Sequence, residues 1–308
     1  MRVVIFGTGG VGGYFGGLLA NAGHDLTFVA RGKHLEAIKS HGLQIKSVNG
    51  DFTVYPAQAI DNPRAISPPD YMVVAVKDYQ LDEVLPDLEA LAGPQTTVVP
   101  LLNGVDAHER LIEALGPDGV VGGLCSLVTM IEAPGIIRQE SALRRVVVGE
   151  LNREKSDRVE RIVQAWRECG VEAIHADDIH VAIWTKFVFI ASFGGISALS
   201  HTTAGELIGC RETWSLLIQA MGEIESLARD QGIALAPDVV DAAVSLLENF
   251  EPTATSSFQR DVSAGKPFEL EAFSGKIMRL GRERGVETPV HDSMYALLRP
   301  ALARAMGG

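Results

Sequence analysis

Val3-Val4-Ile5-Phe6-Gly7-Thr8-Gly9-Gly10-Val11-Gly12, near the start of this 308-residue chain, is a short apolar run followed at once by glycines. Val3–Phe6 has the composition of a buried β-strand, and a helical pattern follows the glycines. Gly7, Gly9 and Gly12 lie between the two with the spacing G-x-G-x-x-G. The order strand, glycine turn, helix predicts the start of a parallel sheet with crossover helices.

Each glycine of this spacing has a physical task when a dinucleotide binds. The first permits a tight turn, the second lets the backbone approach a pyrophosphate, and the third lets the helix pack on the strand. Amide groups at the helix N-terminus then face the anion. We therefore expect a dinucleotide site formed by Gly7, Thr8, Gly9, Gly10, Val11 and Gly12. The alternative interpretation is that the glycines only turn the chain.

The second strand, expected over Leu26–Ala30, ends in Arg31 where NAD-binding proteins have an acid. A carboxylate there accepts hydrogen bonds from the ribose 2′-hydroxyl, whereas a guanidinium attracts a 2′-phosphate. Arg31, with Lys33 close by, therefore predicts NADPH as the cofactor. The alternative is a solvated turn, because exposed basic residues are common.

Two further apolar runs, Met72–Val76 and Thr97–Pro100, have the composition of strands covered on both faces. They lead to Lys77 and to the pair Asn103-Gly104. Ligands of open α/β sheets bind beyond the carboxyl ends of the strands. Lys77 is thus a candidate for a phosphate or a substrate carboxylate, and Asn103 for the nicotinamide ribose or the substrate, unless they are only an exposed lysine and a turn.

Other patterns set the remaining architecture. The pair Asn49-Gly50 predicts a hairpin over Leu43–Val54 with a type I′ turn. Leu124–Ile131 and Arg145–Val148 are further β-rich runs. Beyond residue 176 the apolar residues recur every three or four positions, which indicates helices. We expect an α/β domain over residues 1–176 and a helical domain over residues 177–308.

Composition excludes several classes of protein. The 39 acidic residues outnumber the 27 basic ones, which gives a net charge of −12. Such a surface repels phosphate backbones and anionic lipids, so nucleic acid and membranes are poor candidate partners. The three widely spaced cysteines fit a reducing compartment and suit neither a disulfide framework nor a zinc site. We expect a folded cytoplasmic protein without a metal.

Two segments imitate membrane signals. Residues 1–22 resemble a secretion signal, but their glycines interrupt its apolar core. The uncharged run Phe187–Gly205 contains serines, threonines and a histidine, whereas a spanning helix wants about 20 predominantly apolar residues. We expect a buried helix followed by a polar turn there.

A lysine interrupts an apolar helix face in the second half. Ile179, Ile183, Lys186, Ile190 and Gly194 follow one another at steps of three and four, so they share one face. A lysine in such a place commonly extends to water or meets a carboxylate. The other interpretation is a general acid, which needs a pKa of about 7–8 in place of about 10.4. Such a lysine would protonate the oxygen of a carbonyl that receives hydride.

The chain resembles the 2-dehydropantoate 2-reductase (ketopantoate reductase) family over essentially its whole length. The elements that carry the likeness follow one another in the family's order: Gly7–Gly12, Arg31, Lys77 with Gln80, Asn103-Gly104, Trp184-Thr185-Lys186, Ser256-Ser257 and Glu269. The set is specific to the family, whereas each member alone is not.

The resemblance implies an α/β Rossmann N-terminal domain that binds NADP(H), an all-α C-terminal domain like that of 6-phosphogluconate dehydrogenase, and a cleft between them. It implies Lys186 as the general acid and Glu269 as a carboxylate that holds the substrate hydroxyl and tunes the lysine. Asn103 and Ser257 would contact the substrate. Within the family, Arg31 would meet the 2′-phosphate.

Lys77, Gln80 and Asn103 would also contact the cofactor, by the same resemblance. The implied reaction is the NADPH-dependent reduction of 2-dehydropantoate to (R)-pantoate, on the route to pantothenate and coenzyme A. A small 2-oxo acid is then the substrate, and exposed apolar surface on the helical domain would allow a homodimer.

Three positions depart from the family pattern. Asparagines are expected four and eight residues after the lysine, where this chain has Ile190 and Gly194, and another is missing just before Ser256. We therefore expect a pocket that is more apolar near Ile190 and roomier at Gly194. Two alternatives stay open: a reductase of another branched 2-oxo acid, and an NADPH-binding sensor without catalysis.

Overall fold

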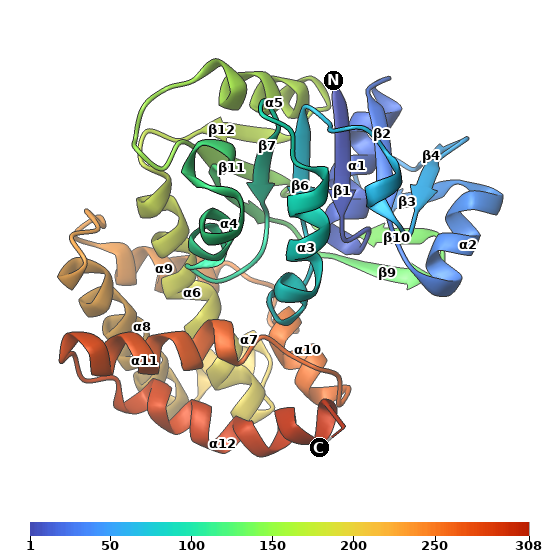
Figure 1. Cartoon of the computed structure of the whole chain (residues 1–308). Coiled ribbons are helices and arrows are strands. Elements are labelled where there is room, and N and C mark those ends of the chain that lie inside the picture. Colours follow the sequence, from blue (N-terminus) through green and yellow to red (C-terminus); the bar gives the residue numbers. More distant parts are fainter. Residues whose placement is uncertain (308) are drawn as a thin grey trace. The chain divides into compact units, whose positions relative to one another are not determined.

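β1 (Arg2–Phe6) is the central strand of a parallel five-stranded sheet in the computed structural model, which describes residues 1–307 (Figure 1). The strand order is β5-β2-β1-β6-β7, and every neighbouring pair is parallel. The other members are β2 (Asp25–Val29), β5 (Gln58–Ile60), β6 (Tyr71–Val74) and β7 (Thr97–Pro100). Because the order reverses beside β1, this is the doubly wound topology that binds dinucleotides, and the predicted Rossmann fold is confirmed.

Side chains of β1 alternate between two cores. Val3 and Ile5 belong to the core on one face of the sheet, whereas Val4 and Phe6 belong to the core on the other. Figure 1 shows α1 behind this sheet and α3 in front of it. The helices of this part are α1 (Gly10–Asn21), α2 (Gly32–His41), α3 (Leu81–Leu91), α4 (Ala107–Leu115) and α5 (Asp157–Glu168). Burial on both faces explains the continuous apolar runs that predicted β6 and β7.

Two smaller sheets complete this part of the chain. One has the order β4-β3-β10-β9 and the other β12-β11-β8. Their strands are β3 (Leu43–Ser47), β4 (Phe52–Val54), β8 (Gly122–Ser126), β9 (Thr129–Ala133), β10 (Ile136–Gln139), β11 (Arg145–Gly149) and β12 (Glu172–His175). The predicted run Leu124–Ile131 is therefore split between two strands of different sheets.

The hairpin predicted around Asn49-Gly50 is present as β3 and β4, but its turn is not of type I′. A type I′ turn needs positive φ at both central residues. Among the described residues only Arg153 and His201 have positive φ without being glycine, so Asn49 does not meet this condition. The Gly50 N–H instead donates to Ser47 O at 2.9 Å, which makes Gly50 the last residue of the turn.

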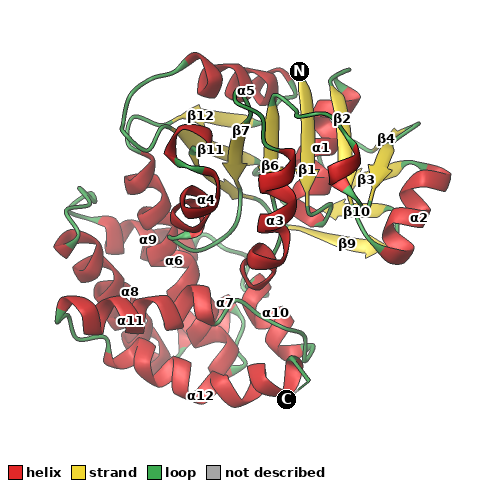
Figure 2. Ribbon diagram, viewed as in Figure 1, coloured by secondary structure: helices red, strands yellow, loops and turns green. Residues whose placement is uncertain are grey.

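The second half is helical, as the apolar spacing predicts (Figure 2). The chain divides into compact units Met1–Ile179 and His180–Gly308, where the sequence suggested a boundary at residue 176. The helices of the second half are α6 (Ile179–Ser200), α7 (Ala204–Gly209), α8 (Arg211–Asp230), α9 (Val239–Glu248), α10 (Ser257–Ser263), α11 (Lys276–Arg284) and α12 (Pro289–Ala305). A π-helical turn, Glu271–Gly275, precedes α11.

Helix α6 is long and apolar enough to cross a membrane by length and composition alone. However, 67% of its most apolar window is buried within the fold. The run beginning at Phe187 thus forms a buried helix that ends at Ser200, and His201 follows in a turn with a φ of 55°. This is the buried helix and polar turn that the sequence predicts.

A buried acid and a buried histidine fix the start of α12. Glu223 of α8 accepts hydrogen bonds from the N–H groups of Val290 and His291, at 2.7 and 3.0 Å. The His291 ring is fully buried, with Nε2 3.1 Å from Ala220 O. Burial lowers the pKa of His291 to about 4 and raises the pKa of Glu223. The imidazole is therefore neutral in the folded protein near pH 7.

Candidate active site

The predicted cofactor residues lie at one edge of the parallel sheet. Arg31 follows β2, the glycine loop follows β1, Lys77 follows β6 and Asn103 follows β7. These strands are direct neighbours in the order β2-β1-β6-β7 and run in the same direction. Their carboxyl ends therefore meet at one edge, which is where ligands of doubly wound sheets bind.

The glycine loop is tightly held at its ends and open in its middle. Gly7 has a φ of +90°, and a Cβ there would lie 2.8 Å from Val76 Cγ1. A Cβ on Gly12 would lie 2.2 Å from Gly7 O. In contrast, nothing lies within 4 Å of a Cβ built on Gly9, the residue that begins α1 without a side-chain cap. The loop thus leaves space at the residue where a phosphate would approach the helix N-terminus.

Arg31 precedes α2 and is exposed, as is Lys33. Arg31 Nη1 lies 3.6 Å from Oε2 of Glu83, an exposed residue of the first turn of α3. No acid stands at the end of β2 itself. The cationic group that would attract a 2′-phosphate is therefore present, but an opposing carboxylate that the sequence did not reveal stands beside it.

Lys77 and Gln80 belong to one short turn. The Lys77 N–H donates to Gln80 Oε1 at 3.3 Å, and the Gln80 N–H donates to Lys77 O at 2.8 Å. The Gln80 side chain therefore shapes the turn that carries Lys77. Asn103 is half-buried, and Gly104 after it has a φ of +100°, which favours glycine at that position.

The predicted catalytic residues Lys186 and Glu269 and the predicted substrate contact Ser257 come from three elements of the second unit. Lys186 is half-buried on α6, Ser257 is the exposed first residue of α10, and Glu269 precedes the π-helical turn and is only 4% exposed. Single π-helical turns occur frequently at functional sites. A buried carboxylate is rare unless it has partners, so Glu269 is a candidate for more than a surface role.

Four phenylalanines, which we call the aromatic hub, join these three elements. Phe273 meets Phe187 edge to face at 5.8 Å between ring centroids and stacks on Phe258 at 5.3 Å. Phe268 meets Phe258 at 5.2 Å, also edge to face. All four rings are buried. Aromatic pairs of this kind favour fixed geometries, so the hub orients the backbones that carry them.

Members of the hub are sequence neighbours of the predicted catalytic and substrate-contact residues. Phe187 follows Lys186, Phe258 follows Ser257 and Phe268 precedes Glu269. In addition, the Phe273 N–H donates to Glu269 O at 3.1 Å. The fold therefore brings together the elements that carry Lys186, Ser257 and Glu269, which are up to 83 residues apart in the chain.

The hub also corrects one expectation. Gly194 does not give a roomier pocket, because a Cβ there would lie 3.3 Å from Phe258 Cβ and 3.6 Å from Phe273 Cε2. The space left by the absent side chain is filled by these two rings. Ile190 is half-buried on the same face of α6 as Lys186, so an apolar side chain does stand at that position.

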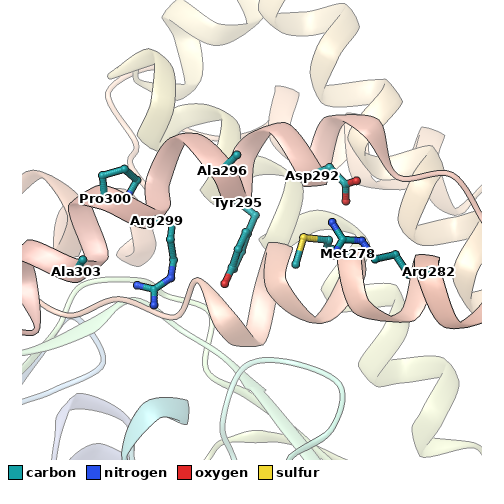
Figure 3. A pocket seen from close by; sticks show the side chains of 8 residues that line it. All are labelled: Met278, Arg282, Asp292, Tyr295, Ala296, Arg299, Pro300 and Ala303. Atoms are coloured by element: carbon teal, nitrogen blue, oxygen red, sulfur yellow. The ribbon is translucent and has the colours of Figure 1, made fainter.

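A surface pocket of about 640 Å³ lies elsewhere, between α11 and α12 (Figure 3). Figure 3 shows Tyr295 and Arg299 extending from α12, and Met278 and Arg282 from α11. The Tyr295 hydroxyl donates to Glu271 Oε1 at 2.8 Å. None of the residues predicted from the sequence lines this pocket, so it is distinct from the candidate active site.

Family models match the chain on both sides of the unit boundary. The model described as ketopantoate reductase PanE/ApbA matches residues 3–153, and that described as ketopantoate reductase PanE/ApbA C terminal matches residues 178–301. The chain belongs to the ketopantoate reductase family. The family resemblance inferred from the motifs is thereby confirmed, and the protein is an oxidoreductase of the ketopantoate reductase family.

Individual ketopantoate reductases match over nearly the whole chain. The 2-dehydropantoate 2-reductase of Mesorhizobium japonicum is 31% identical over 97% of this chain and 97% of its own. The crystal structure of 2-dehydropantoate 2-reductase from Methylococcus capsulatus is 29% identical, with a TM-score of 0.90 over 99% of this chain and 98% of its own. A D-mandelate dehydrogenase solved with NADH and anilino(oxo)acetate is 23% identical, with a TM-score of 0.90 over 99% of each chain, and shows the shared fold.

Sequence reasoning missed two residues that contact the candidate cofactor residues. Glu83 lies on an exposed helix face more than 50 residues after Arg31, and no pattern joins the two. His34 contacts the glycine loop through its ring, with Nε2 2.8 Å from Thr8 O. A histidine three residues after Arg31 carries no motif, so only the folded backbone reveals this contact.

Proposed function

We propose that this protein is an NADPH-dependent reductase that converts 2-dehydropantoate to (R)-pantoate in pantothenate and coenzyme A biosynthesis. The observation that carries the proposal is the aromatic hub, which joins the elements of Lys186, Ser257 and Glu269. Family membership supports the same reaction, since the 2-dehydropantoate 2-reductase of Mesorhizobium japonicum matches along both halves of the chain.

The first unit supplies residues that fit a dinucleotide. The open space at Gly9, beside an uncapped helix N-terminus, suits a pyrophosphate. Arg31 is exposed and suits a 2′-phosphate, which favours NADPH over NADH. Lys77, Gln80 and Asn103, at the ends of the neighbouring strands, would complete the cofactor site. A bound reduced nicotinamide dinucleotide supplies the hydride that reduces a carbonyl carbon.

The second unit supplies the groups that handle the substrate and the proton. The Lys186 ammonium donates its proton to the carbonyl oxygen of the 2-oxo acid as that oxygen becomes a hydroxyl. Glu269 accepts a hydrogen bond from the substrate hydroxyl and tunes the lysine, and Ser257 contacts the substrate. A general acid positioned in this way contributes about 10²- to 10⁴-fold to the rate. Asn103 of the first unit is a further substrate contact.

Steady-state oxidation of NADPH with 2-dehydropantoate and a panel of 2-oxo acids tests this proposal. We expect the highest kcat/KM with 2-dehydropantoate and a clear preference for NADPH over NADH. Turnover of 2-dehydropantoate no faster than that of its analogues would rule out the pantoate assignment. Absence of turnover with every carbonyl compound, together with tight NADPH binding, would favour a sensor.

A second candidate is the reduction of another branched 2-oxo acid whose side chain is more apolar than that of 2-dehydropantoate. Ile190 favours it, because an apolar residue stands on the Lys186 face where the family pattern has an amide. The D-mandelate dehydrogenase of the same fold acts on a hydroxy acid, as its name states. Including 2-oxo-3-methylbutanoate and phenylglyoxylate in the panel separates the two candidates by their relative kcat/KM.

Assembly and location are part of the same proposal. We expect a cytoplasmic homodimer with no nucleic acid, membrane or metal partner. The ketopantoate reductase of Staphylococcus aureus, which shares the fold, is described as dimeric. Light scattering coupled to size-exclusion chromatography measures the mass in solution, and a mass near 33 kDa would exclude the dimer.

A further inference from the structure

Both ring nitrogens of His34 contact backbone groups. Nε2 lies 2.8 Å from Thr8 O, and the Gly135 N–H donates to Nδ1 at 3.0 Å. An amide N–H can only donate, so Nδ1 must be the unprotonated nitrogen. The proton therefore sits on Nε2 and is donated to the Thr8 carbonyl. The partners fix a single neutral tautomer, and burial, which lowers the pKa of His34, favours the same neutral state.

Thr8 is held on its other side by β2. Its N–H and its hydroxyl both donate to Val29 O, at 3.2 and 2.9 Å, and the residue is 4% exposed. With the carbonyl held by His34, every polar group of Thr8 has a defined partner. The peptide plane between Thr8 and Gly9 is therefore fixed in one orientation.

That orientation determines where the Gly9 N–H points. The one cis peptide bond in the described residues joins Tyr55 and Pro56, so the peptide between Thr8 and Gly9 is trans. The carbonyl and the N–H of a trans peptide point in opposite directions. Because His34 binds the Thr8 carbonyl, the Gly9 N–H is directed away from His34. Gly9 is also the loop residue with nothing within 4 Å of a built Cβ.

The turn between β9 and β10 holds His34 in place. Gly135 has a φ of +78°, and a Cβ there would lie 3.0 Å from Ala37 Cβ, so glycine lets this turn sit directly on α2. The same hairpin reaches the loop at its other end, because a Cβ on Gly10 would lie 2.9 Å from Thr129 Cγ2. The glycine loop is thus braced by the hairpin at two points, one of them through His34.

We propose that His34 is a positioning residue for the dinucleotide: by holding the Thr8 carbonyl it presents the Gly9 N–H to the pyrophosphate. The inference rests on the proposed dinucleotide site. It does not depend on the choice between NAD and NADP, since both carry the same pyrophosphate. His34 touches neither cofactor nor substrate in this scheme, and it acts only through the loop backbone.

Direct binding measurements by isothermal titration calorimetry test the inference. His34→Ala is expected to raise the Kd for NADP⁺ about three- to tenfold. This change corresponds to the free energy of roughly one hydrogen bond, the one by which His34 holds the Thr8 carbonyl. The amide group of His34→Gln keeps a hydrogen-bond acceptor and a donor on one carbon atom. The Kd of this variant for NADP⁺ is therefore expected to stay within about twofold of wild type. His41→Ala, an exposed histidine at the end of the same helix, is the matched control and should bind NADP⁺ unchanged.

A second ligand separates positioning of the loop from a general loss of structure. Adenosine 2′-monophosphate lacks the pyrophosphate, so His34→Ala should bind it as wild type does. In steady-state assays the KM for NADPH should rise while kcat and the KM for the 2-oxo acid stay constant. Equal weakening of both nucleotides, or an unchanged Kd for NADP⁺, would overturn the inference and leave the proposed function standing.

The wild-type protein offers a test that needs no variant. ¹⁵N NMR should show the Nε2-protonated tautomer of His34, and titration with NADP⁺ should shift the Gly9 amide proton. An Nδ1-protonated ring, or a Gly9 amide that does not move on saturation, contradicts the inference. Wild-type protein that binds neither NAD⁺ nor NADP⁺ would instead overturn the proposed function.

Discussion

Arg31 Nη1 lies 3.6 Å from Glu83 Oε2, so the cation expected to meet a 2′-phosphate already has an anion beside it. Both side chains are more than 60% exposed. Exposed pairs of this kind contribute about 0–1 kcal/mol, so the pair does not lock Arg31. The pair does place a negative charge, that of Glu83, close to where the 2′-phosphate of NADPH would bind.

Replacing Arg31 by alanine should raise the KM for NADPH about ten- to a hundredfold and leave that for NADH nearly constant. The reason is the loss of charge-assisted hydrogen bonds, which are worth about 1.5–3 kcal/mol each. Initial rates with each cofactor at saturating 2-oxo acid provide the measurement. Equal effects on the two cofactors would refute a role at the 2′-phosphate.

Glu83→Gln should act in the opposite direction. Removal of the carboxylate leaves Arg31 to the phosphate alone, and we expect the Kd for NADP⁺ to fall about two- to fivefold while that for NAD⁺ hardly changes. Glu89→Gln changes the same charge on an exposed position of the same helix and is the control. The difference in Kd for NADP⁺ between Glu83→Gln and wild type should shrink as ionic strength rises, because salt screens exposed charges. Weaker NADP⁺ binding by Glu83→Gln would show that the Glu83 carboxylate favours NADP⁺ binding and does not oppose it.

Lys186→Ala should lower kcat about 10²- to 10⁴-fold, because the carbonyl oxygen would lose the proton donor that we propose for it. The Kd for NADPH, measured by fluorescence titration, should stay within about twofold. Lys266→Ala, an exposed lysine of the same unit, is the control and should leave kcat unchanged. A Lys186→Ala variant with full activity would exclude the general acid and favour the sensor.

Gly194→Ala tests the packing of the aromatic hub, and Gly222→Ala, at a helical position without close neighbours, is its comparison. At Gly194 a new Cβ would lie 3.3 Å from Phe258 Cβ, close to the backbone of α10, so Gly194→Ala should destabilise the protein by about 1 kcal/mol and lower kcat/KM. Gly222→Ala, in the interior of α8 with nothing within 4 Å, should stabilise it by about 0.5–1 kcal/mol. Urea unfolding gives both values, and a stabilising Gly194→Ala would show that α10 moves aside at little cost.

Acid should destabilise the fold through His291. The folded pKa is about 4, below the unfolded value of 6.5, so the unfolded state binds the extra proton as the pH falls through this interval. Its contribution to stability is complete above pH 6.5, and about 3 kcal/mol is lost by pH 4 at 1.36 kcal/mol per pH unit. The raised pKa of Glu223 acts in the opposite sense, and the nearby Asp292 carboxylate raises that pKa further.

Comparison with His291→Gln therefore isolates the histidine. Urea unfolding at pH 7 and pH 4.5 should show a smaller loss of stability on acidification for the variant than for wild type. Identical losses would mean that His291 is not the group whose protonation opposes folding.

Local patterns sufficed for the features that depend on neighbouring residues. The strand, glycine turn and helix at the start of the chain and the single face of α6 that carries Lys186 follow from residue spacing. The prediction of a type I′ turn at Asn49-Gly50 was wrong. The hydrogen bond from the Gly50 N–H to Ser47 O makes Gly50 the fourth residue of the turn, one position later than predicted. Short strands such as β5 and β12 carry too few apolar residues to show a pattern.

Features made by residues far apart in the chain could not be predicted from the sequence. Gly194 suggested an open pocket, yet Phe258 and Phe273, more than 60 residues later, fill the space. His34 contacts Thr8, 26 residues earlier, and the turn at Gly135, about 100 residues later. Tertiary packing decides such contacts, and no period or propensity encodes them.

The glycine loop depends on both neighbours of β1, since the Thr8 N–H donates to the Val29 carbonyl of β2 and a Cβ on Gly7 would lie 2.8 Å from Val76, just beyond β6. Parallel strands far apart in sequence pair slowly during folding, because a long loop must close first. The loop can acquire its shape only once β1 has paired with β6, about 68 residues along the chain. Dinucleotide binding would therefore report that β1 has paired with β2 and β6, and its recovery during refolding would time the pairing of β1 with β6.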